Sequence, residues 1–156
     1  MAWLQRHAWQ ILFAVTVLIA LIGVNPVVNG INEDPSVPLG VAGMTAAQLE
    51  ADNPNSFRLI DLQARFSGVD LIAMGALLSA VLLGAFRHGA RWAWWAMWLL
   101  PLWAASAFAM ILAIGVAPGE PPPTPMVSGP VIALLSSALL LVSAPRFFGR
   151  EAAQRD

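Results

Sequence analysis

Four long runs of apolar residues dominate the chain, and polar stretches separate them. A membrane-spanning helix needs about 17–25 mostly apolar residues, and runs of that length cover residues 8–24, 66–86, 92–117 and 126–144. The pattern predicts an all-α, polytopic membrane protein with four transmembrane helices in a compact bundle. The chain, residues 1–156, is then a single integral membrane domain.

The first run resembles a secretory signal peptide at its start, where Arg6 and His7 precede it. However, the apolar region of a signal peptide has only about 7–15 residues, and no convincing small-x-small cleavage pattern follows this run before Asn25-Pro26. We therefore expect a retained signal-anchor helix.

Composition and charge narrow the classes of protein further. Hydrophobic residues make up 58% of the chain and charged residues 11%, against a usual charged share of about 25%. The net charge is −1, whereas nucleic-acid-binding proteins carry a basic patch or stripe, so the sequence gives no indication of nucleic-acid binding. The chain has no cysteine, which excludes disulfides, thiolate nucleophiles and cysteine-held metals or clusters.

The arginines predict the orientation in the membrane. Basic residues are enriched in cytoplasmic loops, and six of the eight arginines fall on the side that holds both termini and the short connection between the second and third spans. We therefore expect cytoplasmic termini, with a cytoplasmic tail at residues 145–156 and an outer loop at residues 25–65. The six are Arg6, Arg87, Arg91, Arg146, Arg150 and Arg155, and the two outer ones are Arg58 and Arg65.

Tryptophans gather on the same side as the six arginines. Amphipathic rings prefer the membrane interface, so a belt that anchors the first and third helices is the favoured interpretation. An aromatic cage is the alternative. The residues are Trp3, Trp9, Trp92, Trp94, Trp95 and Trp98.

The outer loop carries clear local signals. It opens with turn chemistry at Asn25-Pro26 and Asn29-Gly30. Thr45-Ala-Ala-Gln48 is a capping-box pattern and predicts a short helix to about Asp52. Asn53-Pro54 then predicts the start of a helix that runs without interruption into the second span.

Arg58, Asp61 and Arg65 share one face of that helix before it enters the membrane. Such spacing is common in solvated charge ladders, whose pairs contribute only about 0.2–0.5 kcal/mol each. The alternative is that Arg58 and Arg65 bind an anion or a lipid headgroup.

Asp70 is the one acid within a predicted span, about 6 Å below its outer edge. A carboxylate at membrane depth tends to face the bundle or a wet cavity and to mark a functional site. The other interpretation places Asp70 at the interface, paired with a neighbouring donor. The sequence leaves both open.

Signals for helix packing are stronger than signals for catalysis. Small residues spaced by four let membrane helices approach closely, and Pro101 predicts a kink that frees the Met97 carbonyl. No internal repeat is present, and neither the two histidines nor the intramembrane serines have the partners that a metal site or a nucleophile needs. The small-residue rows are Ala76, Ala80 and Gly84 in the second span and Gly129, Ala133 and Ser137 in the fourth.

The stretch Phe86–Pro101, together with Asn53-Pro54 and Arg65-Phe66-Ser67-Gly68, resembles a pattern in small, uncharacterised four-helix bacterial membrane proteins of a broadly DoxX-like kind. The resemblance covers about residues 52–102. It implies a compact four-span bundle in a bacterial inner membrane. DoxX relatives are tied in some cases to quinone-linked sulfur oxidation, but no residue roles carry over.

We therefore expect a non-catalytic small subunit, or an assembly or stabilising partner, of a larger membrane complex. Its partners would be lipids and other membrane subunits or further copies of the chain, with no cofactor and no metal. The alternative function is binding or transformation of a lipophilic molecule, a quinone or a lipid, at an outer site formed by Asp70, Arg65 and Arg58.

Overall fold

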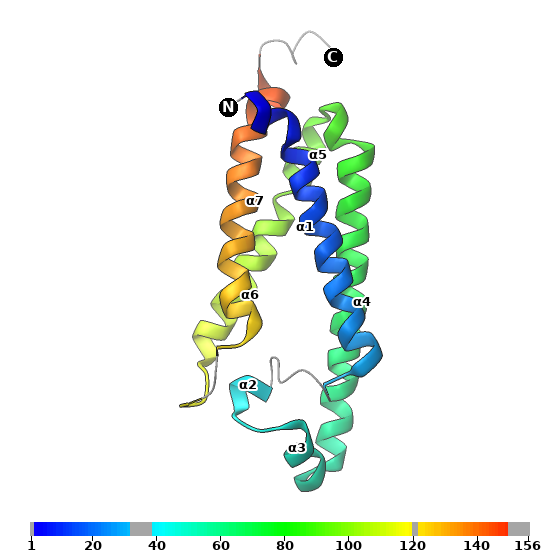
Figure 1. The fold of residues 1–156 in the computed structure, drawn as a ribbon, viewed down its shortest axis with the longest axis vertical. Helices are drawn as coiled ribbons and strands as arrows, with labels where there is room; N and C mark the ends of the chain where they lie inside the picture. Colours follow the sequence, from blue (N-terminus) through cyan, green and yellow to red (C-terminus); the bar gives the residue numbers. More distant parts are fainter. Residues whose placement is uncertain (1, 32–38, 120–121, 150–156) are drawn as a thin grey trace.

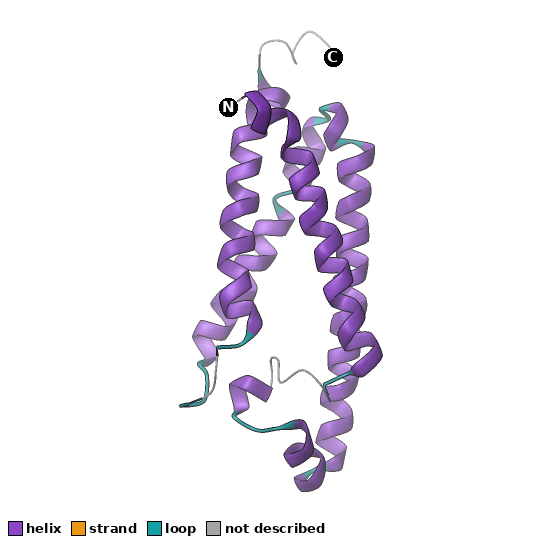
Figure 2. Ribbon diagram, in the orientation of Figure 1, coloured by secondary structure: helices purple, strands orange, loops and turns teal. Residues whose placement is uncertain are grey.

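The computed structural model describes residues 2–31, 39–119 and 122–149. These residues are helical or lie in the connections between helices, and the described part of the chain holds no strand (Figure 2). In chain order the helices are α1 (Ala2–Asn29), α2 (Leu39–Ala42), α3 (Ala46–Asp52), α4 (Pro54–Gly84), the 3-10 helix η1 (Phe86–His88), α5 (Arg91–Ala96), α6 (Leu99–Ile114) and α7 (Thr124–Phe148).

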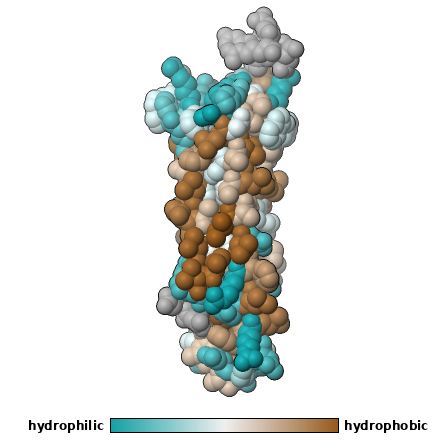
Figure 3. All heavy atoms as spheres, turned by 90° about the vertical axis from the view of Figure 1, so that its right-hand side faces the viewer, coloured by the Kyte–Doolittle hydropathy of each residue, from teal (hydrophilic) through white to brown (hydrophobic). Residues whose placement is uncertain are grey.

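Four helical segments are long and apolar enough to cross a membrane, as the sequence predicted: α1, α4 with η1, α5 with α6, and α7. The protein is therefore an integral, multi-pass membrane protein. Both ends of the described chain lie at one end of the bundle, here called the termini end, whereas α2 and α3 lie at the other, the loop end (Figure 1). Seen from the α4 side, apolar side chains gather in the middle and polar ones toward both ends (Figure 3).

The helices associate as two pairs. α1 packs along α4, α6 packs along α7, and α1 also contacts α7, which joins the pairs. The pairs diverge toward the loop end (Figure 1). The main core lies nearer the termini end, and its fully buried members include Leu12, Leu82, Phe86, Met97, Leu100, Leu140 and Phe147.

The predicted helix starts in the outer loop are confirmed. Thr45 Oγ1 accepts from the Gln48 backbone N–H while Gln48 Oε1 accepts from the Thr45 N–H, which completes the capping box of α3. Asn53 Oδ1 accepts from the Ser56 N–H at the start of α4, with Pro54 in the first turn. These side chains satisfy N–H groups that have no partner within the helix.

The predicted turn at Asn25-Pro26 is wrong, because α1 continues through both residues to Asn29. Proline inside a helix removes one backbone hydrogen bond and crowds the carbonyl four residues before it, but Pro26 lies in the last turn of α1, which continues only three residues beyond it. The chain turns instead at Gly30, which has a φ of +64°. Asn29-Gly30, the second turn signal, therefore marks the end of α1, and residues 25–29 belong to the helix rather than to the loop.

The predicted kink in the third span is confirmed. α5 ends at Ala96 and α6 begins at Leu99. Because Pro101 has no N–H to offer the Met97 carbonyl, that carbonyl accepts instead from the Leu100 N–H at 3.2 Å, in a tighter turn. The resulting break directs α5 toward the end of α7, which it contacts.

α4 is longer than a membrane requires. Its 31 residues span about 46 Å, whereas a hydrocarbon core is about 30 Å thick, so about ten residues project. Ile31, Leu39 and Leu49 form a small buried cluster against Phe57 and Ile60 on this projecting part. The cluster holds the α2–α3 region against α4 at the loop end.

Candidate functional site

Arg65 joins α4 to the end of α1 at the loop end. Its Nε donates to Asp61 Oδ2 at 2.9 Å, and its Nη1 donates to the Val27 carbonyl at 2.8 Å and the Val28 carbonyl at 3.1 Å. The last carbonyls of a helix have no partner within it and carry partial negative charge. The Arg65 guanidinium therefore satisfies two of these groups and also holds the Asp61 carboxylate.

Asp61 makes the second half of this contact. Its Oδ1 accepts from the Ile31 N–H at 3.2 Å, just beyond the turn at Gly30. A Cβ atom at Gly30 would collide with the same Oδ1 atom, so the carboxylate occupies space that only glycine leaves free. We call this arrangement of Arg65, Asp61 and Gly30 the α1–α4 clasp.

The α1–α4 clasp shifts the pKa of the Asp61 carboxyl group. Asp61 lies in the part of α4 that precedes the predicted second span. The hydrogen bond from Arg65 lowers the pKa of Asp61 below its usual 3.8. Burial raises it by a smaller amount, while the Ile31 N–H and the positive charge of Arg65 add to the lowering. The charged carboxylate is therefore the favoured form in the folded protein.

Arg58 stands apart from the clasp. Its side chain is exposed, and within the described chain no ion pair or hydrogen bond engages it. Of the predicted ladder, only the Asp61–Arg65 pair forms. Arg65 is committed to α1 and Asp61, so the structure does not bring Arg58 and Arg65 together around one anion.

Asp70 lies on a different side of α4. Five residues separate it from Arg65, a rotation of about 140° around a helix. Asp70 is exposed, whereas the buried residues of α4, which include Gly68 and Gly75, lie on the side that packs against α1. No hydrogen bond or ion pair reaches Asp70 from the described residues. The structure therefore does not unite Asp70 with Arg65 or Arg58 in one site.

The internal contact between α1 and α4 uses glycines that the sequence reasoning did not select. A Cβ atom at Gly68 would lie 2.6 Å from the Gly23 carbonyl oxygen, and one at Gly75 would lie 2.6 Å from the Thr16 carbonyl oxygen. A hydrogen bond of 2.8 Å between Thr16 Oγ1 and Ser79 Oγ crosses the same contact. The seven-residue spacing of Gly68 and Gly75 was the signal that could have identified this face.

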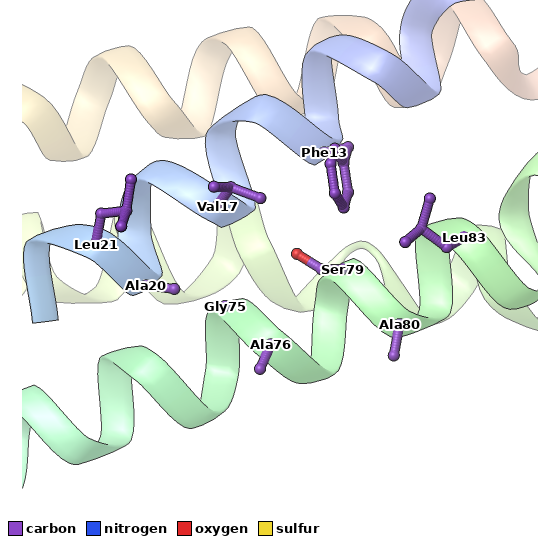
Figure 4. Close-up of a pocket in the computed structure, with 9 residues that line it drawn as sticks. All are labelled: Phe13, Val17, Ala20, Leu21, Gly75, Ala76, Ser79, Ala80 and Leu83. Carbon is purple, nitrogen blue, oxygen red and sulfur yellow. The ribbon is translucent and has the colours of Figure 1, made fainter.

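The predicted row in the second span faces outward. Ala76, Ala80 and Gly84 are all exposed, and a Cβ atom at Gly84 would meet nothing within 4 Å. Ala76 and Ala80 point away from α1 (Figure 4). This row is therefore not used to hold α4 against the rest of the described chain.

The row in the fourth span has a different position. Gly129 is buried, and a Cβ atom there would lie 3.0 Å from the Ala104 carbonyl oxygen of α6. Ala133 and Ser137 are partly buried. Gly129 thus belongs to the internal α6–α7 contact.

An apolar groove of about 450 Å³ runs along the outside of the α1–α4 contact. Phe13 and Leu83 flank it at one end and Leu21 lies at the other (Figure 4). The Ser79 hydroxyl at its base is already bonded to Thr16. The remaining lining residues are Val17, Ala20, Gly75, Ala76 and Ala80.

The six predicted anchor tryptophans lie on α1 and on the α5 region, at or near the termini end, but they do not share one environment. Trp3, Trp92 and Trp95 are exposed, and Trp9 and Trp98 are partly buried. Trp94 is buried and donates from Nε1 to the Leu140 carbonyl of α7 at 2.9 Å. Its role within the described chain is to join α5 to α7.

The two histidines bond to their own segments. His7 Nδ1 donates to the Trp3 carbonyl at 2.8 Å, and His88 Nδ1 donates to the Gly84 carbonyl at 2.9 Å. The residues that the structure describes contain no group of three or more His, Asp or Glu side chains suited to a metal ion.

Comparison with known proteins yields no match to a family model, to a curated protein or to a solved structure. The resemblance to DoxX-like proteins therefore stays a prediction.

Proposed function

We propose that this integral membrane protein is a non-catalytic small subunit, or an assembly or stabilising partner, of a larger membrane complex. The observation that carries the proposal is the exposed row Ala76, Ala80 and Gly84 on α4. Membrane helices associate through close packing rather than through a hydrophobic drive, and small residues permit that packing. The bundle itself uses Gly23, Gly68 and Gly75, so the row stays available to a partner.

Native mass spectrometry after gentle extraction from the membrane tests the proposal. We expect a stoichiometric partner protein to accompany the unaltered chain. Leucine in place of both Ala80 and Gly84 should release that partner without unfolding the chain, because neither residue supports an internal contact.

Ala138→Leu is the matched control, since Ala138 is exposed on α7 and outside both small-residue rows. The same partner should remain bound to it. A second pair, Ala133→Leu with Ser137→Leu, tests the other row. Partner binding that survives both pairs of changes would contradict the proposal, as would a chain that is never accompanied by another protein.

We propose a bacterial inner membrane with cytoplasmic termini as the location, on the strength of the arginine distribution and the DoxX-like resemblance. The first turns of α1, η1, the start of α5 and the end of α7 lie toward the termini end (Figure 1), and they carry Arg6, Arg87, Arg91 and Arg146. The first half of α4, which lies toward the loop end, carries Arg58 and Arg65. Because the chain has no native cysteine, single cysteines in place of Gln5 and Ser56 can be labelled without background. In intact cells, an impermeant maleimide should label the second and not the first.

The second candidate function is binding of a lipophilic molecule. The apolar groove beside α1 and α4 favours it, because its volume and lining suit an acyl or isoprenoid chain. Ala76→Trp would fill the groove and should remove a co-purifying lipid or quinone from the native mass spectrum. Asp70→Asn should leave such a ligand in place if the groove alone holds it.

A further inference from the structure

The side of α4 that faces away from α1 carries a continuous line of exposed residues. They recur at intervals of three or four, which is the spacing of one helix face. Large apolar side chains are exposed along it, with Leu59 at 68%, Phe66 at 60% and Leu77 at 62%. We call this line the outer face of α4; its residues are Leu59, Leu62, Phe66, Asp70, Ala73, Leu77, Ala80 and Gly84.

Lipid alone does not account for the whole outer face. Leu59 and Leu62 precede the predicted second span, which begins at Phe66, and they lie on the part of α4 that also carries Arg58 and Asp61. The apolar line thus crosses from the membrane into the aqueous side. A protein helix that follows the line in both environments would cover it throughout.

The carboxylate of Asp70 indicates which kind of charged side chain the partner helix should carry. It lies in the middle of the outer face, one turn inside Phe66, and the described residues provide it with no ion pair or hydrogen bond. A carboxylate that meets lipid is costly, and intramembrane charges usually pair with an opposite charge. The complement to this face is therefore an apolar helix with one basic side chain at the depth of Asp70.

A second copy of the chain is a poor complement. A symmetric dimer about an axis along the membrane normal places the same surface on both sides. Such a dimer would bring the two Asp70 carboxylates together, and like charges repel. The charge pattern favours a different protein.

The sizes of the side chains along the outer face indicate how closely the partner helix can pack at each end. The outer face is small at Ala73, Ala80 and Gly84 and bulky at Leu59 and Phe66. A partner helix can approach the α4 backbone closely only along the segment that carries these small side chains, from Ala73 to Gly84. A complementary helix would lie near α4 toward the termini end and carry smaller residues toward the loop end.

We propose that the outer face of α4 binds a transmembrane helix of another protein, and that an arginine or lysine of that helix pairs with Asp70. This inference rests on the proposed function and adds to it the surface and the chemistry of the partner.

Photocrosslinking in native membranes tests the surface. A photoreactive amino acid is placed singly at Leu62, Ala73 or Leu77 of the outer face, and at Leu134, an exposed position of α7, as the control. We expect one protein to be captured from all three α4 positions, with the crosslinked peptide in a transmembrane segment that contains arginine or lysine.

A charge exchange tests the pairing. Asp70→Arg should lower the crosslinking yield about tenfold or more, because it places two cations together. Replacing the partner's basic residue with aspartate should restore the yield in that variant. Glu50→Arg, the same charge change at an exposed acid of α3, should leave the yield unchanged.

The outcomes separate this inference from the proposed function. Protein captured only from Leu134 would overturn the outer face as the binding surface and leave the subunit function standing. Two copies of this chain in the product would overturn the choice of partner. A yield that Asp70→Arg does not change would overturn the charge pair, and capture of lipid alone at every position would overturn both proposals.

Discussion

Gly23 and Gly68 face each other across the contact between α1 and α4, and a Cβ atom on either residue would lie 2.6 Å from the carbonyl oxygen of the other. Cβ atoms in folded proteins essentially never come that close to a neighbour. The atoms in the way are backbone atoms, which cannot rotate aside. The spacing of these two helices therefore depends on the absence of two side chains.

Gly68→Ala should destabilise the bundle. Forcing a methyl group into a well-packed contact costs about 1–3 kcal/mol, because the helices have to separate. The free energy of unfolding in detergent, followed by circular dichroism during titration with a denaturing detergent, measures the effect.

Gly84→Ala is the matched control, because a Cβ atom there meets nothing within 4 Å. Gly84 is the last residue of α4 and does not have a positive φ, so alanine fits there without strain and this variant should be about as stable as the parent. Equal losses in the two variants would contradict the close contact at Gly68.

Gly30→Ala should weaken the α1–α4 clasp for two reasons. The positive φ of Gly30 is strained for alanine by about 1–2 kcal/mol, and the new Cβ atom would displace the Asp61 carboxylate. Gly119 also has a positive φ, of +88°, but open space around it. Gly119→Ala therefore carries the strain without the collision, and the unfolding free energy should fall further in Gly30→Ala than in this control.

Arg65→Met should separate the loop end of α1 from α4. It removes the bonds to the Val27 and Val28 carbonyls and leaves Asp61 without its cation. Hydrogen bonds to charged groups contribute about 1.5–3 kcal/mol, and the 40% exposure of the Arg65 side chain places the expected loss toward the lower end. Hydrogen exchange of the last turn of α1 should rise. Arg58→Met, at an exposed arginine on the same helix, should leave this exchange unchanged.

Stability should depend on pH through Asp61. Because its pKa is lower in the folded protein than the usual 3.8, its contribution is complete above the unfolded-state value and is lost as pH falls through the folded-state value. The unfolding free energy should therefore decline on acidification below about pH 4. Asp61→Asn should flatten this decline, and a decline of equal size in that variant would assign the effect to other carboxyl groups.

Local signals in the sequence were enough to predict the four long helices and the positions of several helix ends. Thr45 and Asn53 cap their helices, and Pro101 interrupts the third span, because each effect involves only neighbours within about one turn. The turn predicted at Asn25-Pro26 was wrong because a local signal of this kind carries no information beyond its own neighbours. A turn dipeptide is equally compatible with the last turn of a helix, and here α1 continues to Asn29.

The pairing of the helices could not be predicted in the same way. The α4 sequence offers two small-residue faces, one with Gly68 and Gly75 and another with Ala76, Ala80 and Gly84. The first pair is seven residues apart and the second row is spaced by four, and both spacings keep small residues on one side of a helix. A helix that is apolar on all sides does not mark its buried side. Only the position of α1 decides between them. The contact of Arg65 with Val27 likewise joins residues 38 apart in sequence, which no local pattern encodes.

Trp94→Phe should loosen the termini end. The Trp94 indole is buried at 6% exposure, and its N–H donates to the Leu140 carbonyl across the contact between α5 and α7. Phenylalanine retains an aromatic ring but removes the donor and leaves a small void, with an expected cost of about 1–3 kcal/mol. The Leu140 carbonyl keeps its bond from Ser143 Oγ at 2.9 Å, which limits the loss. Trp95→Phe is the matched control, because Trp95 is 63% exposed. Thermal unfolding in detergent should show a lower midpoint for Trp94→Phe alone, and a control that falls as far would assign the effect to the loss of indole surface rather than to this bond.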